Sequence, residues 1–268
     1  MVILKSPREI EKIRFSNQIV AEILGELKEK VVPGIDTLTL NRISEELAAR
    51  KDAKPAFKGY RGFPFSLCAS VNEQVVHGFP SKVPLEEGSI LSMDFGIYYN
   101  GYYGDSAITI AVGEVSDAAK SLMTVTEAAL YMGIGQAVPG KRLSDISHAI
   151  QKHVEEAGFS VVRKFVGHGI GKDLHEDPQI PNYGNPGLGV RLKPGMVFAI
   201  EPMVNMGGYE VETLEDRWTA VTKDRSLSAH FEHTIAITAD GPVILSDVDG
   251  QPSLSKSSIS VVENIVAI

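Results

Sequence analysis

The stretch Gly88–Asp94, GSILSMD, runs a mostly apolar strand pattern directly into a carboxylate, and Gly195–Glu201, GMVFAIE, repeats this pattern. We expect both acids to be largely buried. Burying one ionised carboxylate without a partner costs several kcal/mol even after the surroundings relax. A chain that does so twice is therefore predicted to bind a cation there, and a metal ion is the first candidate.

The repeat extends beyond these two strands. Val32-Pro33-Gly34 and Val138-Pro139-Gly140 each precede a helical pattern; the two prolines are 106 residues apart and the two acids 107. These offsets predict a duplicated αβ unit, with halves of about 1–112 and 113–248 in one domain and a site between them. The Ser-rich tail, 249–268, has no role that the sequence identifies; it is either an extra strand or a loose end.

Composition narrows the class of protein. The net charge of −8 argues against a general nucleic-acid binder, although it leaves a local basic patch open. The single cysteine, Cys68, excludes an intramolecular disulfide and a thiolate zinc cluster, and indicates a reducing compartment. No apolar run approaches the ~18 residues of a membrane helix, and charged residues interrupt the first fourteen positions as no signal peptide would. We expect a soluble, cytoplasmic protein.

Hydrophobic periodicity predicts an α+β fold with a largely antiparallel sheet. The first helix opens with a capping box, Ser6-Pro7-Arg8-Glu9. Helices are expected over about 7–31, 38–51, 117–134 and 144–157. Strands are expected over about 66–72, 89–98, 103–112, 161–165, 196–205, 209–214, 218–222, 230–238 and 242–246.

A hairpin is predicted to bring two acids together. Asn100-Gly101 tolerates the positive φ values of a type I′ turn, which would place Asp94 opposite Ala107 and Asp105 opposite Gly96. The two acids would then share a face as diagonal neighbours, roughly 5 to 8 Å apart. A bulge in the second strand would shift this register and separate them.

A fourth acid fits the same pattern, because Glu232 opens an apolar strand as Asp105 does. Asp94, Asp105, Glu201 and Glu232 would repel one another and take up protons unless about two divalent ions neutralise them. Oxygen-rich ligation with one imidazole suits Mn²⁺, Fe²⁺ or Co²⁺, with Zn²⁺ as an alternative. The simpler interpretation is that these are strand-end acids capped by backbone groups and by Arg or Lys.

Two motifs carry a family resemblance. Gly167–Gly184, GHGIGKDLHEDPQIPNYG, closely resembles the signature of type I methionine aminopeptidases, and Ser70–Gly78, SVNEQVVHG, resembles a second family motif. The similarity runs from about residue 5 to 247 and is closest to the short bacterial form. It implies a pita-bread fold of two pseudo-symmetric halves. It also implies a dinuclear metal site whose five ligands are Asp94, Asp105, His168, Glu201 and Glu232.

The resemblance also implies the reaction, which is removal of the N-terminal methionine from nascent proteins and peptides with a small second residue. A hydroxide shared by two metal ions would attack the scissile carbonyl. Asp105 and Glu232 would bridge the ions, Asp94 would chelate one, and His168 and Glu201 would complete the other. Glu201 would also pass a proton from the water to the leaving amine, while His77 and His175 would hydrogen-bond the substrate around the amide.

Specificity would come from an apolar slot for an unbranched thioether. The resemblance places the following residues around it, together with His77 and His175: Phe57, Tyr60, Phe63, Cys68, Leu174 and Trp218. Each could instead be ordinary core. Relatives often carry an aromatic residue where this chain has Leu174, so we expect a roomier slot. Cys68 is interpreted as a lining residue and not a nucleophile, because no His-Asn arrangement accompanies it.

Two other functions are the alternatives to this one. Prolidases and aminopeptidase P share the fold but usually carry an added N-terminal domain and lack the His175–Pro178 context. Non-catalytic relatives that bind protein or RNA typically lose metal ligands, whereas all five are present here. Cleavage of Met-Ala-Ser against Ala-Pro-Ala would separate these functions. We further expect a monomer that acts on nascent polypeptide N-termini and docks near the ribosomal exit tunnel.

Overall fold

The computed structural model describes residues 2–247, and four α-helices lie within them: α1 (Pro7–Lys28), α2 (Thr37–Arg50), α3 (Asp117–Ile134) and α4 (Leu143–Glu156). The predicted capping box is present in α1. The Ser6 side chain accepts a hydrogen bond from the Glu9 N–H, and the Glu9 carboxylate accepts one from the Ser6 N–H at 2.9 Å. α1 ends three residues before the predicted boundary, because the chain turns after Lys28 toward Pro33.

The strands within residues 2–247 are β1 (Lys54–Pro55), β2 (Leu67–Val71), β3 (Gln74–Val76), β4 (Ile90–Tyr99), β5 (Tyr102–Ala111), β6 (Ser160–Val161), β7 (Gly167–Gly169), β8 (Glu176–Ile180), β9 (Val197–Ile200), β10 (Met203–Asn205), β11 (Val211–Thr213), β12 (Ala220–Thr222), β13 (Ser228–His230), β14 (Glu232–Thr238) and β15 (Gly241–Ile244).

These strands pair antiparallel throughout. The central sheet follows the order β1-β4-β5-β14-β9-β7-β8, with β2 added beside β4 and β15 beside β14. There are also two three-stranded sheets, β13-β10-β6 and β11-β12-β3. This arrangement confirms the predicted α+β class.

Three predicted strands differ in the structure. The run 196–205 is two strands in different sheets, because Pro202 has no N–H to continue the ladder. The run 230–238 also divides, after His230. The strand predicted over 161–165 stops at Val161, and beyond it the Arg163 guanidinium lies 4.2 Å from the centroid of the Tyr209 ring. Two strands that matter for the site, β7 and β8, were not predicted.

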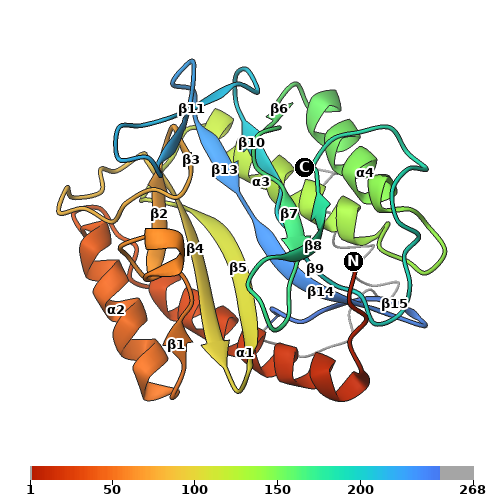
Figure 1. Cartoon of the computed structure of the whole chain (residues 1–268). Coiled ribbons are helices and arrows are strands. Elements are labelled where there is room, and N and C mark those ends of the chain that lie inside the picture. Colours follow the sequence, from red (N-terminus) through yellow and green to blue (C-terminus); the bar gives the residue numbers. More distant parts are fainter. Residues whose placement is uncertain (1, 248–268) are drawn as a thin grey trace.

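Two apolar clusters attach the helices to the sheet. Figure 1 shows α2 beside β1 and α4 on the opposite side of the molecule. In the first cluster, α1 and α2 pack against β4 through residues that include Leu24, Leu47 and Phe95. In the second, α3 and α4 pack against β9 and β14 through residues that include Ile150 and Phe198. The two helix pairs thus pack against different strands of the same central sheet.

The division into halves of about 1–112 and 113–248 stays a prediction, and the Ser-rich tail lies outside the described residues. None of the helices within residues 2–247 is both long enough and apolar enough to cross a bilayer.

Candidate metal centre and substrate pocket

The hairpin of β4 and β5 has the predicted register. Asn100 and Gly101 have φ values of 48° and 89°, as a type I′ turn requires, and Asp94 pairs with Ala107 while Asp105 pairs with Gly96. The two acids therefore occupy one face. Gly96 has to be glycine, since a Cβ there would lie 2.8 Å from the Phe57 ring and 3.2 Å from Asp105 Oδ1.

The next strand adds Glu232 to the same row. β14 pairs with β5 so that Glu232 is also opposite Ala107, which places Asp94 and Glu232 on either side of that residue. Two hydrogen bonds to the backbone of Asp105 hold it in place: its N–H donates to Asn17 Oδ1 at 3.1 Å, and its carbonyl accepts from Thr234 Oγ1 at 2.8 Å. These bonds tie α1, β5 and β14 together at the site.

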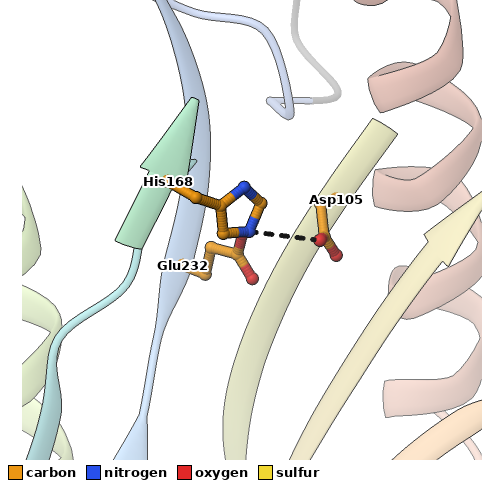
Figure 2. A group of neighbouring side chains, drawn as sticks. All are labelled: Asp105, His168 and Glu232. Carbon is orange, nitrogen blue, oxygen red and sulfur yellow. Dashed lines mark ion pairs between the residues drawn. The ribbon is translucent and has the colours of Figure 1, made fainter. Parts of the chain in front are cut away.

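His168 and Glu201 reach the cluster from the other side of β14. His168 lies on β7, and its Nε2 is 3.9 Å from Asp105 Oδ2 and 3.6 Å from Glu201 Oε1. One donor atom each from Asp105, His168 and Glu232 lie within 4.8 Å of one another (Figure 2). The fold thus brings together all five predicted ligands from four strands and one strand end.

Burial and mutual repulsion raise the pKa values of the four acids. Burial raises the pKa of Asp94 to about 7. It also raises the pKa of Asp105 and of Glu201 well above the usual range, and the Asp94 charge adds to both effects. The pKa of Glu232 rises for the same reason, first from burial and then from Asp105. Nearby charges disfavour ionisation here, so the cluster stores electrostatic repulsion that a cation would relieve.

His168 is held as a neutral ligand. Burial lowers its pKa to about 4, and its Nδ1 lies 2.9 Å from the Gly169 carbonyl oxygen, which fits an Nδ1–H donor. That tautomer leaves the lone pair of Nε2 facing the carboxylates. A neutral imidazole with its other nitrogen hydrogen-bonded to a carbonyl is the usual form of a metal-binding histidine.

The residues present therefore fit a divalent metal centre. Asp94 Oδ1, Asp105 Oδ1 and Glu232 Oε1 are buried and have no hydrogen-bond partner among residues 2–247. Within that part of the chain, no Arg or Lys pairs with these acids, so the simpler interpretation of capped strand-end acids does not hold. Unpaired buried oxygens that converge on a neutral imidazole are the donor set of a hard or borderline cation.

A cavity of about 150 Å³ opens from this cluster, and its walls contain every residue that was predicted for the site. Phe63 and Trp218 meet edge to face, with ring centroids 5.2 Å apart. Leu174 and Cys68 are 2% and 4% exposed. Burial raises the pKa of the Cys68 thiol well above its usual range, which disfavours the thiolate that a nucleophile would need. The slot is therefore apolar at one end and acidic at the other.

The two predicted catalytic histidines both line this cavity. Burial lowers the pKa of His77 to about 4, so its ring is neutral, and its backbone has a φ of 59°, a left-handed conformation that costs energy for a non-glycine residue. His175 Nδ1 lies 2.9 Å from the Tyr60 hydroxyl oxygen, and its ring centroid is 4.2 Å from that of His168. Both rings can exchange hydrogen bonds with a polar substrate.

Two residues at the site were not predicted. Arg61 lines the cavity beside Tyr60, and its guanidinium is 5.3 Å from the centroid of that ring. His230 is fully buried with its Nε2 3.7 Å from Glu201 Oε2. Strand periodicity offered a signal for His230, since it stands two positions before Glu232. For Arg61 the only signal in the sequence was its place next to Tyr60.

Comparison with known proteins supports the assignment of a metal centre. The model of metallopeptidase family M24 matches residues 11–239. A Bacillus subtilis protein named methionine aminopeptidase 1 is 56% identical over 248 residues, covering 92% of this chain and 100% of that protein. The crystal structure of a Thermotoga maritima methionine aminopeptidase superposes with a TM-score of 0.91 at 50% identity, covering 92% of this chain and 100% of that one.

Prolidases are more distant. The Pyrococcus furiosus prolidase has a TM-score of 0.74 at 24% identity, and the aligned part covers 91% of this chain but only 65% of the prolidase. That likeness shows the shared pita-bread fold, which confirms the fold that the sequence motifs implied. With a family model over most of its length and relatives that match from end to end, the chain belongs to metallopeptidase family M24 and, within it, to the methionine aminopeptidases.

Proposed function

We propose that this chain releases the N-terminal methionine of proteins and peptides at a centre of two divalent ions held by Asp94, Asp105, His168, Glu201 and Glu232. Metal-dependent removal of N-terminal methionine is the activity of the family. The observation that carries the proposal is the joining of two features in one cavity, namely buried carboxylate oxygens without partners and a wall of aromatic and aliphatic side chains.

Each ligand has a proposed place. Asp105 and Glu232, on adjacent strands, would bridge the two ions, and Asp94 would chelate one of them. His168 and Glu201, 3.6 Å apart, would complete the other. Divalent ions bound there supply a water of lowered pKa and polarise the peptide carbonyl. Oxygen-rich ligation favours Mn²⁺, Fe²⁺ or Co²⁺, with Zn²⁺ as an alternative.

The chain's own residues would position the substrate and move the proton. Glu201, whose pKa burial raises well above the usual range, is suited to accept a proton from the attacking water and to pass it to the leaving amine. His77 and His175, which both line the cavity, would hydrogen-bond the substrate around the scissile amide. The aromatic wall of Phe57, Phe63 and Trp218 would enclose the methionine side chain and exclude water.

The biological setting is proposed on the same basis. We infer that the natural substrates are nascent polypeptide N-termini with a small second residue, since a bulky one would clash at the mouth of the slot. We further propose that the chain acts in the cytoplasm, as a monomer, at or near the ribosome.

The first experiment measures methionine release from Met-Ala-Ser by chelator-stripped protein titrated with Mn²⁺, Fe²⁺ or Co²⁺. We expect metal-dependent release that Glu201→Ala abolishes, and no release from Ala-Pro-Ala. Isothermal titration with Mn²⁺ should give two sites per chain. Folded protein that releases no methionine with any metal would contradict the proposal, and cleavage of Ala-Pro-Ala alone would indicate a prolidase-like enzyme.

A further inference from the structure

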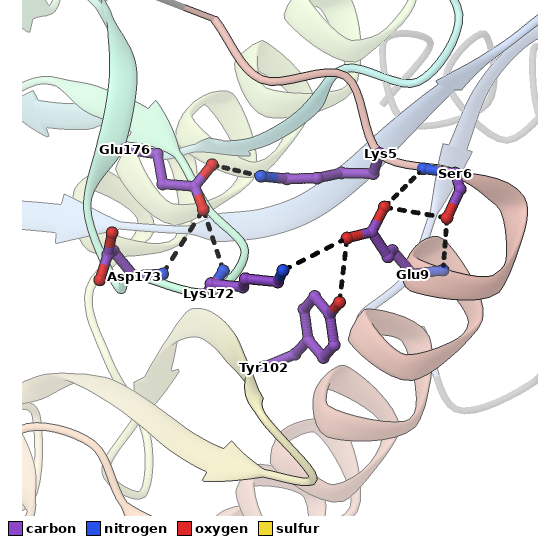
Figure 3. Close-up of polar contacts among 7 residues, drawn as sticks. All are labelled: Lys5, Ser6, Glu9, Tyr102, Lys172, Asp173 and Glu176. Carbon is purple, nitrogen blue, oxygen red and sulfur yellow. Dashed lines mark hydrogen bonds and ion pairs between the residues drawn. The ribbon is translucent and has the colours of Figure 1, made fainter.

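The turn between β7 and β8 carries two residues of the pocket, Leu174 and His175. The carboxylate of Glu176 binds the backbone of this turn. Glu176 Oε1 accepts hydrogen bonds from the N–H groups of Lys172 at 2.9 Å and Asp173 at 3.4 Å. The other oxygen, Oε2, accepts one from Lys5 Nζ at 2.5 Å. Figure 3 shows the Glu176 side chain between the turn and the N-terminal segment. A single carboxylate thus joins the turn to a segment 171 residues away.

This ion pair is buried, in contrast to most ion pairs of the chain. The side chains of Lys5 and Glu176 are 3% and 7% exposed, whereas Lys172, on the same turn, pairs with Glu9 with its own side chain 69% exposed. Buried charges are tolerated only when they are paired and hydrogen-bonded, and removal of one partner leaves the other uncompensated. Burial therefore requires the Lys5 ammonium and the Glu176 carboxylate to stay paired.

The backbone around Lys5 fixes its side chain in place. The Lys5 N–H donates to the Gly195 carbonyl at 2.7 Å. The ammonium group passes against Gly171, where an added Cβ would lie 2.6 Å from Nζ. Gly171 in turn accepts a hydrogen bond from the Tyr103 N–H at 2.8 Å. Lys5 thus lies between the start of the turn and the residue that leads into β9, the strand that ends beside Glu201.

The turn has a direct connection to the reaction. His175 precedes Glu176 in the chain, its ring contacts both His168 and Tyr60, and Leu174 closes the slot. Any movement of the Glu176 carboxylate would move the backbone N–H groups that it binds. Misplacement of a catalytic group by about 1 Å can lower the rate about 100-fold.

We propose that Lys5 and Glu176 are positioning residues for methionine release: their buried ion pair fixes the 172–175 turn and thereby sets where His175 and Leu174 stand in the pocket. This inference rests on the proposed contact between His175 and the substrate. A purely structural ion pair would instead stabilise the fold without any particular effect on His175.

The test compares Lys5→Met and Glu176→Gln with Lys172→Met, which removes an exposed ammonium from the same turn. With Mn²⁺ and Met-Ala-Ser, kcat of the first two should fall about 10- to 100-fold. Lys172→Met should retain the kcat of the parent. The same substitutions are then made in a His175→Ala background. There they should change kcat less than about twofold, because the group that they position is already gone.

A second readout does not depend on activity. In metal-free protein labelled at its histidine rings, the His175 signals, identified by their loss in His175→Ala, should shift in Glu176→Gln while those of His148, remote from the pocket, stay in place. Where Glu176→Gln fails to fold, Gly171→Ala serves instead, since its methyl group would lie 2.6 Å from both Glu176 Oε1 and Lys5 Nζ and so displaces the pair while it removes neither charge.

Three results would overturn the inference. Equal losses of kcat in the parent and in the His175→Ala background would mean that the pair acts only through the fold. Full kcat in Lys5→Met and Glu176→Gln, with an impaired His175→Ala, would remove the positioning role and leave the proposed function intact. Full kcat in His175→Ala would remove the proposed role of His175, and this inference with it.

Discussion

Asp94 and Glu232 stand on either side of Ala107, each paired with it across a different strand ladder, so that one small residue of β5 separates the half-buried carboxylate of Asp94 from the buried carboxylate of Glu232. Asp105 lies two positions before Ala107 on the same face. The sheet register alone therefore concentrates three acids, and nothing larger than alanine stands between them. Such a cluster is unfavourable for an empty protein and favourable for one that holds cations.

Removal of one of these acids should have opposite effects on activity and on metal-free stability. Asp105→Asn should lower metal-dependent methionine release at least about 100-fold, because a ligand is lost. At pH 8 without metal, the same variant should unfold about 3–6 °C higher, because a carboxyl whose folded pKa is raised destabilises the fold above its unfolded pKa, and Asn removes that cost. A peptide-release assay measures the loss of activity, thermal melting without Mn²⁺ measures the gain in stability, and the rise in Tm that Mn²⁺ induces should disappear in the variant.

The matched control is Glu114→Gln, which neutralises an acid whose side chain is 91% exposed. It should change the free energy of unfolding by less than about 0.5 kcal/mol and leave the metal response unchanged. A metal-free Asp105→Asn protein that is less stable than the parent would show that the acids are held by partners and do not repel one another.

Local chemistry made the acid pair predictable. The turn type at Asn100 and Gly101 fixes the register of β4 against β5, so the positions of Asp94 and Asp105 follow from nearby residues alone. The ligand His168 is different. β7 is three residues long and glycine-rich, and its place depends on pairing with β8 and β9, which no local pattern of residues 167–169 reveals. Motif resemblance identified this ligand where periodicity could not.

The strand end at Glu201 shows where pattern reading failed. The apolar run 196–205 predicted one strand, but Pro202 divides it and sends the chain into another sheet. Glu201 stands at this division. His230, the last residue of β13, was missed because its neighbour Glu201 comes from a different strand end, after β9, and long-range contacts of this kind arise only when the sheets assemble.

Close packing between α1 and β5 should make Gly104 sensitive to substitution. A Cβ at this position would lie 2.6 Å from the backbone carbon of Ser16 and 2.7 Å from the Asn17 nitrogen. Gly104→Ala should therefore displace α1 and destabilise the protein by about 2–3 kcal/mol. Urea unfolding measures the change. Because Asn17 holds the Asp105 backbone, metal affinity should fall as well.

Gly25→Ala is the control for this prediction, since Gly25 lies in α1 and an added Cβ would meet nothing within 4 Å. Alanine is a better helix former than glycine, so this variant should be more stable by about 0.5–1 kcal/mol. Equal stability of the two alanine variants would mean that α1 can shift on the sheet without cost.

The size of the methionine slot should depend on Leu174, which is 2% exposed and faces the cavity. Leu174→Phe should narrow the slot, so that kcat/KM for substrates with a side chain one methylene longer than methionine falls about tenfold more than for methionine itself. Peptides that begin with methionine, norleucine and ethionine allow this comparison. Leu188→Phe, at a position 59% exposed, should leave the ratios unchanged. A parent enzyme that already rejects the longer side chains would show that the slot is no roomier than an aromatic-lined one.

Acid should weaken the start of α1 in a way that depends on Glu9. Hydrogen bonds from the backbone and side chain of Ser6, and from the Tyr102 hydroxyl, lower the pKa of the Glu9 carboxyl to about 2 from its ordinary 4.5. A carboxyl with a lowered folded pKa contributes stability above its unfolded pKa and loses that contribution as the pH falls toward the folded value. The contribution of Glu9 is therefore complete at pH 7 and declines between about pH 4.5 and 2.

Glu9→Gln should accordingly be less stable than the parent at pH 7, and the difference should shrink at pH 4 and again at pH 3, as measured by urea unfolding. Glu11→Gln provides the comparison at pH 7. Its carboxylate lies 3.3 Å from Arg14 Nε with the side chain 59% exposed, and exposed ion pairs of this kind contribute little. A gap between Glu9→Gln and the parent that widens on acidification would mean that the carboxylate is stabilised in the unfolded chain and not at the cap.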